Sequence, residues 1–203
     1  GGAIGQVFYP AFARIRDRGE SLAPAYLRVV GGYTAIVWPG MAGLAVASVP
    51  LVHFLYGAKW AGVAPLLTFI ALSEILLFAL PLHNDIPILK GKIGVLIKFA
   101  CVDTIVAIGL LVTASQYDVT TAAASRLACA VLWFALYARF MQRIVAFRWA
   151  DMLGLYARGL LAAGAAATPL LLCYQFWIPA ADMGIGALLF FAGLGVPLWA
   201  ATL

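Results

Sequence analysis

Residues 50–65 read PLVHFLYGAKWAGVAP and form the clearest break in a long apolar part of the chain. Tyr56-Gly57 predicts a turn, and Gly62 and Pro65 precede the next apolar run. Tyr and Trp beside a single Lys are typical of a membrane–water interface, where an aromatic ring is half buried and its polar group stays hydrated. A surface turn of a soluble protein is the alternative, but the apolar flanks are too long to favour it. We therefore expect this stretch to join two membrane spans.

The composition of the whole chain agrees with a lipid environment. Of the 203 residues, 65% are hydrophobic and only 10% are charged, and the mean hydropathy is +1.02. Soluble domains carry about 25% charged residues, so this chain has too few to cover a water-facing surface. The net charge of +5 lies between the apolar runs rather than on one basic face, which argues against nucleic acid as a partner. We expect the counter-charge to come from acidic lipid headgroups.

Six apolar runs are long enough to cross a hydrocarbon core about 30 Å thick. Before them, residues 1–12 predict the end of an apolar helix, terminated by Tyr9-Pro10, and a basic loop follows up to residue 28. The fold class is therefore all-α, a polytopic membrane protein with six transmembrane helices. We divide the chain into residues 1–28, four spans within 29–141, and a basic linker with two further spans within 142–203. The expected spans are 29–50, 63–83, 93–114, 121–141, 157–177 and 184–203.

The distribution of basic residues predicts the orientation. Cytoplasmic connections carry an excess of Lys and Arg, and here the basic residues gather in alternate connections. The opposite connections carry only Lys59 among basic residues, together with Asp118 and Asp182. We therefore place Lys59 outside and predict a multi-pass membrane protein with its basic connections in the cytoplasm. The residues assigned to the cytoplasmic side, ten of the 13 Lys and Arg, are Arg14, Arg16, Arg18, Arg28, Lys90, Lys92, Arg139, Arg143, Arg148 and Arg158.

Four segments together resemble a known family. They are FYPAFARIRDRGESLAPAYLRVV at 8–30, Trp38-Pro39-Gly40 within the first span, VPLVHFLYGAKWAGVAPLL at 49–67, and the turn Lys90-Gly91-Lys92. This pattern resembles the polysaccharide-transporter flippases, which include the Wzx-type O-antigen and exopolysaccharide exporters of the multidrug/oligosaccharidyl-lipid/polysaccharide superfamily. The best matches are Tyr9, Pro10, Ala13 and Arg14, and the turn residues Gly57, Lys59 and Trp60. The resemblance covers roughly the first 100 residues, whereas the last two spans match only in length and hydropathy.

The resemblance implies a larger protein and a transport activity. Members of the family have about fourteen spans, so the six spans would be the ninth to fourteenth, and the 29–141 region would belong to a second lobe. The implied activity is translocation of a lipid-linked oligosaccharide in lipopolysaccharide or exopolysaccharide biosynthesis. The implied partners are membrane lipid, an undecaprenyl-pyrophosphate-linked glycan and a coupling proton or sodium ion. Substrate residues vary within the family, so none is transferred to this chain.

Four ionisable residues lie inside the expected spans, where charge is costly and usually functional. At 1.5 Å per residue, Glu74 lies roughly 16 Å from the Val63 end of its span and Asp103 roughly 15 Å from the Ile93 end of the next, near the midplane. Lys98 and Arg126 lie about 8 Å from a span end and are able to snorkel. Glu74 and Asp103 are candidates for an ion or substrate pathway, or for a structural interhelical hydrogen bond. Arg126 is a candidate partner for one acid or for a pyrophosphate group.

Pro39 in Trp38-Pro39-Gly40 is the candidate hinge. A proline within a span removes a backbone hydrogen bond, and lipid tolerates this only where another group satisfies the freed carbonyl. A static bend and a moving hinge both fit the sequence. The residues indicate neither a metal site nor a cofactor site, since His53 and His83 are expected at opposite faces and no phosphate-binding loop is present.

We interpret the chain as a flippase rather than an enzyme. The alternatives are a multidrug or lipid II exporter of the same superfamily, or a membrane-embedded enzyme or subunit of polysaccharide biosynthesis. A membrane enzyme of this pathway is expected to carry a large polar catalytic loop. The longest loop expected here, Arg143–Tyr156, is basic and cytoplasmic.

Overall fold

A computed structural model describes residues 3–202 of the protein, with side chains described from residue 8. The described residues form helices joined by short connections, without strands, which confirms the all-α polytopic fold class. Five helical stretches are long and apolar enough to cross a membrane: Ala23–Val46, Ala58–Leu77, Ile93–Ser115, Val119–Val145 and Trp149–Phe176. The sixth predicted span is a shorter apolar helix, Ile185–Ala200.

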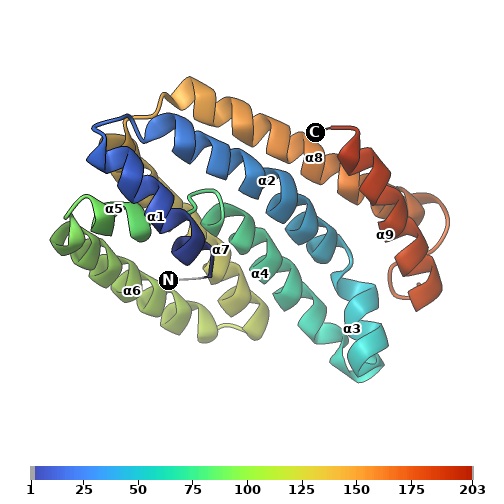
Figure 1. Cartoon of the computed structure of the whole chain (residues 1–203). Helices are drawn as coiled ribbons and strands as arrows, with labels where there is room; N and C mark the ends of the chain where they lie inside the picture. The colour runs from blue at the N-terminus through green and yellow to red at the C-terminus, as the bar shows by residue number, and fades with distance from the viewer. Residues whose placement is uncertain (1–2, 203) are drawn as a thin grey trace.

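The helices form one row in which each packs on the next, in the order α9, α8, α2, α4, α7, α6 (Figure 1). The row does not follow the chain order, because α8 returns to pack along α2. Helices α1 and α5 lie near one end of this bundle of long helices, and α3 and η1 lie near the other end (Figure 1). The bounds are α1 Ala3–Asp17, α2 Ala23–Val46, α3 Ser48–Tyr56, η1 Ala58–Val63, α4 Ala64–Leu77, α5 Asp85–Leu89, α6 Ile93–Ser115, α7 Val119–Val145, α8 Trp149–Phe176 and α9 Ile185–Ala200.

The stretch 50–65 joins two helices as predicted. Gly57 ends α3 with φ of 80°, a conformation that a residue with a Cβ adopts only at a cost. The 3-10 helix η1 then carries Lys59 and Trp60 into α4. The Tyr56 and Trp60 rings lie 6.3 Å apart and both are exposed, as expected for side chains at a membrane–water interface.

Several predicted boundaries differ from the structure, including the start of the first full span, which is Ala23 rather than residue 29. Helix α1 continues through Pro10 to Asp17, because a proline removes one hydrogen bond without ending the helix. Helix α4 ends at Leu77 rather than at residue 83, and an irregular segment, 78–84, follows it. The region predicted as a basic linker, 143–156, is mostly helical, because α7 extends to Val145 and α8 begins at Trp149.

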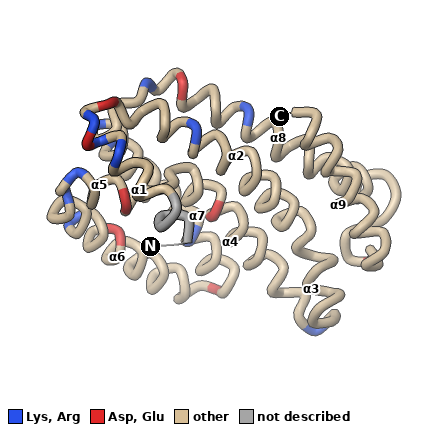
Figure 2. The backbone as a smooth tube through the Cα atoms, viewed as in Figure 1, with Lys and Arg blue, Asp and Glu red and all other residues tan. Residues whose placement is uncertain are grey.

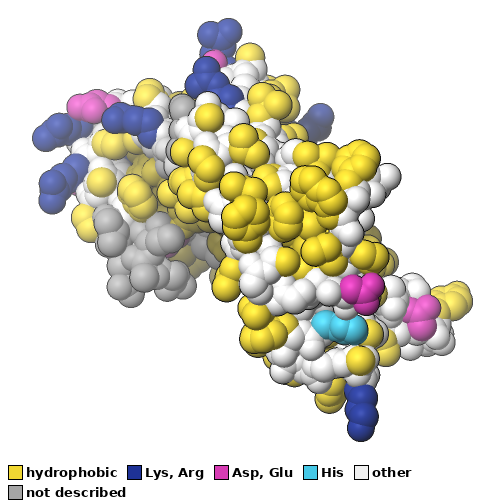
Figure 3. Space-filling model, turned by 90° about the vertical axis from the view of Figure 1, so that its right-hand side faces the viewer, with side chains coloured by type: hydrophobic (Ala, Val, Ile, Leu, Met, Phe, Trp, Pro, Cys, Tyr) yellow, Lys and Arg dark blue, Asp and Glu magenta, His cyan; other side chains and the backbone are white. Residues whose placement is uncertain are grey.

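The two ends of the bundle, measured along the long helices, differ in charge. Figure 2 shows most Lys and Arg residues around α1, α5 and the start of α8, away from α3 and the start of α9. The middle of the molecule is largely apolar, and Figure 3 shows hydrophobic side chains across most of one face with charged ones toward its periphery. This distribution is the one expected for helices that cross a bilayer with their basic end in the cytoplasm.

Candidate functional site

The structure brings two of the four predicted ionisable residues into contact. Glu74 lies on α4 and Arg126 on α7, and Arg126 Nη2 donates to Glu74 Oε1 at 3.4 Å. The Glu74 side chain is 26% exposed and that of Arg126 is 57% exposed. The acid is therefore the shielded partner, and the guanidinium keeps donors free for a second anion.

Asp103 and Lys98 both lie on α6 but are placed differently. Asp103 is half-buried and lies within electrostatic range of Arg126 and His83. Lys98 is exposed, and within residues 8–202 it makes no ion pair. The acid that the structure pairs with Arg126 is thus Glu74, while Asp103 lies near the same cation without a direct hydrogen bond to it.

Arg126 lines a groove of about 370 Å³ formed by α4, α6 and α7. Helix α7 packs against both neighbours, so it forms the floor between them. The polar lining residues are Ser125 and Arg126, and the rest of the lining is mostly aliphatic, with Ile70 from α4 and Ile108 from α6 among it. A single guanidinium in an apolar groove favours an anionic group that also carries an apolar part.

The candidate hinge, Pro39, lies inside α2 and is buried. Its missing N–H leaves the carbonyl of Ala35, four residues earlier, without its helical partner. Trp199 of α9 supplies a replacement, since its Nε1–H donates to Ala35 O at 2.6 Å. The structure therefore meets the condition for a proline inside a membrane-spanning helix through a side chain more than 160 residues away in the sequence.

The irregular segment after α4 is also held by side chains from elsewhere. Ala79 and Leu80 are buried, so their backbone groups need partners within the protein. Tyr156 of α8 donates its hydroxyl to Ala79 O at 2.8 Å, and His83 Nδ1 lies 3.0 Å from Leu80 O. Leu82 has φ of 59°, a costly conformation for a leucine. This segment connects α4, which carries Glu74, to α5 at the basic end of the molecule.

His83 stands edge-on to two aromatic rings of α7. Its ring centre lies 4.8 Å from that of Trp133 and 5.7 Å from that of Tyr137. Burial lowers the pKa of His83, and the hydrogen bond to Leu80 and the nearby acids only partly offset this. Because Leu80 O is an acceptor, Nδ1 carries the proton of this hydrogen bond. His83 is therefore a neutral structural group around pH 7.

Sequence reasoning missed the roles of Trp199, Tyr156 and His83. Trp199 and Tyr156 look in the sequence like ordinary aromatic residues near span ends. The one available signal was indirect. Pro39, and Pro81 in the irregular segment 78–84, each lack an N–H, so each implies a backbone carbonyl that needs another donor. Hydropathy alone does not say which helix supplies them. No group of three or more potential metal-binding side chains occurs within the described residues.

The connection between α6 and α7 shows how local sequence starts a helix. Asp118 is the N-cap of α7, and its carboxylate accepts from the Thr121 backbone N–H. That hydrogen bond is the main reason why the pKa of Asp118 lies below its usual value. The cap fixes the start of α7 and hence the distance of Arg126 from the end of its helix.

Comparisons with known proteins place these features in a family context. Residues 1–65 match the family described as "Polysaccharide biosynthesis protein". The lipopolysaccharide biosynthesis protein WzxC of Escherichia coli (strain K12) is 26% identical over 113 residues, which are 56% of this chain and 23% of that protein. An uncharacterized membrane protein in the cps region of Klebsiella pneumoniae is 23% identical over 108 residues, 53% of this chain and 22% of that protein. No solved structure gives a significant match.

These matches cover only part of each sequence. The chain spans less than a quarter of the length of either curated relative, and the family model covers residues 1–65 of 203. The predicted resemblance is nevertheless confirmed, because the matching family is described as a polysaccharide biosynthesis protein and one relative is named WzxC. The apolar helices and these relatives together indicate a multi-pass bacterial membrane protein. By a partial match, the comparisons therefore support the Wzx-type polysaccharide-transporter family.

Proposed function

We propose that this chain forms part of a flippase that moves a lipid-linked oligosaccharide from the inner to the outer leaflet of the bacterial inner membrane. The observation that carries the proposal is the Arg126–Glu74 ion pair between α4 and α7, at the edge of an apolar groove. Ionisable residues within membrane-spanning segments are rare and are functional candidates by default. The polysaccharide context of the relatives supplies the substrate class.

In this proposal Arg126 attracts the pyrophosphate of the substrate. Glu74 is the more shielded member of the pair and holds the guanidinium toward the groove. When the phosphate arrives, it binds the donors of Arg126 that Glu74 leaves free, and bidentate hydrogen bonds hold it during passage. Glu74 keeps its hydrogen bond to the guanidinium and so holds it in position before and after release. The pair is therefore a reusable binding element rather than a catalytic one, and the protein acts without covalent chemistry.

Asp103 is the candidate for coupling to a proton or sodium ion. It lies near Arg126 but is not its direct partner, so it is the acid left free to bind and release a cation. Pro39 remains the candidate hinge, with the division into 1–28, 29–141 and 142–203 as the proposed arrangement of loop, lobe and added spans. Lys98, exposed on α6, is expected to snorkel and serves as a control.

The test is glycan export in cells that depend on the protein carrying this sequence. Arg126→Ala should reduce surface polysaccharide by about tenfold or more and should accumulate the lipid-linked precursor, because the anion loses its charged donor. Glu74→Gln should have a smaller effect. Asp103→Asn should flatten the dependence of export on external pH if a proton is the coupling ion.

The matched control is Lys98→Gln, which removes a cation from the neighbouring helix. It should leave export close to wild type, with all variants present in the membrane at similar amounts. Equal export by Arg126→Ala and wild type would overturn the role of this groove. An unchanged export in all three variants, Arg126→Ala, Glu74→Gln and Asp103→Asn, would show that the ionisable residues are structural.

A further inference from the structure

The apolar run that carries Pro39 breaks at Ala47, near the end of the bundle that lies away from most basic residues. Helix α2 ends at Val46 and α3 begins at Ser48. Ala47 between them has φ of −79° and ψ of 0°, and this ψ lies outside the range of an α-helix. At Pro39, by contrast, α2 continues without interruption. The span predicted from the sequence therefore consists of two helical pieces joined at Ala47.

A side chain of α8 holds the backbone at this break. Pro50, in the first turn of α3, has no N–H, so the carbonyl of Val46, four residues earlier, needs another donor. Tyr174 of α8 supplies it, since its hydroxyl donates to Val46 O at 3.1 Å. A side-chain hydroxyl thus stands in for the backbone hydrogen bond that would otherwise continue the helix across the break.

A pair of hydroxyl groups fastens the start of α3 to α4. Ser48 is buried, and its hydroxyl oxygen lies 2.7 Å from that of Thr68 on α4. Thr68 has one proton to donate and two carbonyls within reach, Ala64 O at 3.1 Å and Ala45 O at 3.4 Å, so Ser48 is the donor to Thr68. A neutral hydrogen bond contributes only modestly to stability, so this fastening is able to open and close.

Beyond its first turns, α3 is packed lightly on the rest of the molecule. Its buried residues all lie in its first five positions, and its last three residues are each more than half exposed. None of the described residues of η1 is buried. Gly57, which separates α3 from η1, has φ of 80°, in a region of backbone conformation that glycine adopts readily. Helix α3 is therefore a short rod between two bends, at Ala47 and at Gly57.

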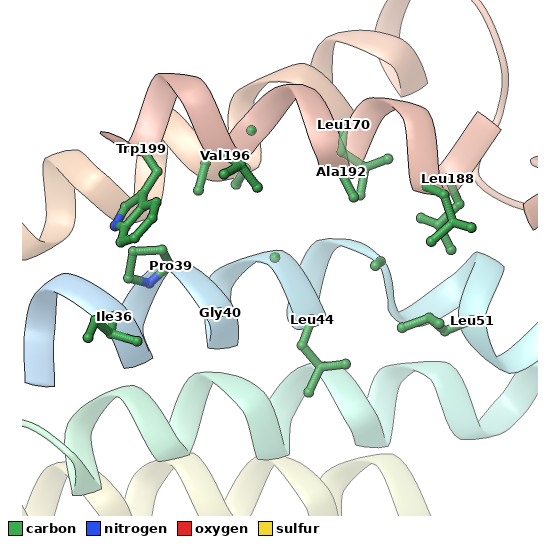
Figure 4. A pocket seen from close by; sticks show the side chains of 16 residues that line it. Ile36, Pro39, Gly40, Leu44, Leu51, Leu170, Leu188, Ala192, Val196 and Trp199 are labelled. Carbon is green, nitrogen blue, oxygen red and sulfur yellow. The ribbon is translucent and has the colours of Figure 1, made fainter. Parts of the chain in front are cut away.

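A groove beside the break gives α3 room to turn. It lies between α2 and α9 over α8, has a volume of about 480 Å³, and reaches Leu51 of α3 and Leu188 of α9. Figure 4 shows these two leucines at the same end of the groove. A Cβ added to Gly43, one turn before Ala47, would meet no atom within 4 Å. Lipid chains are as apolar as leucine, so side chains of α3 replace them in this groove at little cost.

We propose that α3 is a gate at the outer end of the bundle, which turns about Ala47 toward α9 when the Ser48–Thr68 hydrogen bond opens. The structure holds the gate in the position fastened to α4. This joint is separate from the candidate hinge at Pro39, and the movement of α3 does not depend on the proposed transport activity.

The gate acts on the Arg126 groove through α4. Helix η1 leads directly into α4, so a movement of α3 pulls on the first turn of α4. Leu66 and Ile70 of α4 line the groove that contains Arg126. Turning of α3 therefore changes the wall of that groove, a step that rests on the proposed function.

The movement is measured as the distance between two spin labels in the purified protein carrying this sequence, in lipid nanodiscs. The labels are attached at Leu55→Cys on α3 and Phe190→Cys on α9, both of which replace exposed residues. Cys101 and Cys129 are replaced with alanine, whereas Cys173 is fully buried and is kept. Double electron–electron resonance should show two distances, the shorter one with α3 turned toward α9.

Opening the fastening should favour the shorter distance. Ser48→Ala removes the donor and should raise the ratio of the shorter to the longer distance about fivefold. The matched control is Ser73→Ala, since Ser73 is an equally buried serine whose hydroxyl bonds Ile70 O within its own helix. It should leave the ratio unchanged.

Two further substitutions should hold α3 in its fastened position. Pro50→Ala restores an N–H able to bond Val46 O, and Gly43→Leu fills the groove, so each should leave only the longer distance. Gly164→Leu on α8 is the control for the second, because it also meets no neighbour but lies outside the groove. Circular dichroism shows whether each variant keeps its helices.

A single distance in wild type that Ser48→Ala leaves unchanged would overturn the gate, and so would an equal shift with Ser73→Ala. Glycan export tests the link to the Arg126 groove, since Pro50→Ala and Gly43→Leu should both reduce it. Normal export by two variants that show only the longer distance would refute that link. Two distances in a wild type that moves no glycan would instead contradict the proposed function and leave the movement of α3 established.

Discussion

The α2–α8 pair and the α6–α7 pair are both pairs of long packed helices, the first parallel and the second antiparallel, and they differ in burial and in charge. A third of the most apolar window is buried in α2 and in α8, against 6% in α6 and 11% in α7. Between α2 and α8, Trp38 stacks on Tyr156 at 5.4 Å and Thr34 faces Gly159. Helices α6 and α7 instead carry Asp103, Lys98 and Arg126.

This difference separates two roles. Close packing between α2 and α8 gives a scaffold with little freedom to accept new atoms. Most side chains of α6 and α7 are not buried within the described residues, so a substitution there changes an exposed surface rather than the packed core. Ionisable residues of α6 and α7 are therefore more accessible to a substrate than residues buried between α2 and α8. This fits a division into a structural half, α2 and α8, and a substrate-binding half, α6 and α7. The following predictions test this division, beginning with the largest effect.

The scaffold should not tolerate an added side chain at Gly159. A Cβ there would lie 2.9 Å from Thr34 Cβ and 3.0 Å from Trp38 Cε3, so α2 and α8 must move apart. Gly159→Val is expected to lower the free energy of unfolding by about 2 kcal/mol or more. The measurement is thermal unfolding in detergent. Gly109→Val on α6, where the added Cβ meets nothing, is the control and should change stability little. Similar losses in both variants would contradict the division.

The hydrogen bond from Trp199 to Ala35 should matter only because of Pro39. Trp199→Phe removes the donor and is expected to cost about 1–2 kcal/mol of stability, because a buried carbonyl loses its partner. In a Pro39→Ala background, the N–H of residue 39 is able to bond Ala35 O within the helix, so the same substitution should cost less. A double-mutant cycle on thermal unfolding measures this coupling. Additive effects would show that Trp199 does not replace the missing helical bond.

A smaller effect is expected from His83, on the α7 side of the molecule. Burial lowers the pKa of His83 in the folded state below its ordinary value of 6.5. As pH falls below about 6.5, the unfolded chain therefore binds a proton that the folded chain does not, and stability decreases. The loss ends once the pH is below the folded-state pKa.

The measurement is the unfolding temperature from about pH 7.5 to pH 5, compared with His83→Gln. That variant should show a shallower decrease, because it has no proton to bind at this position. His53→Gln, which replaces the histidine on α3 at the opposite end of the bundle, should retain the wild-type slope. Identical slopes in wild type and His83→Gln would remove His83 from this account.

The sequence predicted the fold class and the number of apolar helices well, and boundaries less well. Length and hydropathy are local properties. The predicted turn at Tyr56-Gly57 is therefore present in the structure, and the predicted spans 93–114 and 121–141 nearly coincide with α6 and α7. The early end of α4 at Leu77 was missed because residues 78–83 are as apolar as a helix interior. Their irregular backbone is stabilised by Tyr156, a residue on a distant helix.

The candidate site was predicted as a set of residues but not as an arrangement. Depth along a helix follows from residue number, which put Glu74 and Asp103 near the midplane and Arg126 closer to a span end. Rotation about the helix axis does not follow from hydropathy, so the sequence left open whether Glu74 meets Asp103 or Arg126. The structure pairs Glu74 with Arg126. The order of helices in the row, with α8 beside α2, was also inaccessible, because it depends on packing between segments over 100 residues apart.

The most direct test of the central proposal is reconstituted transport by the protein carrying this sequence. Lipid-linked oligosaccharide is placed in proteoliposomes, and its appearance in the opposite leaflet is measured with an impermeant glycan-modifying enzyme. Wild type and Lys98→Gln should move the substrate at similar rates, and Arg126→Ala should be slower by about tenfold or more. Absence of movement by wild type, or an equal rate for Arg126→Ala, would contradict the account.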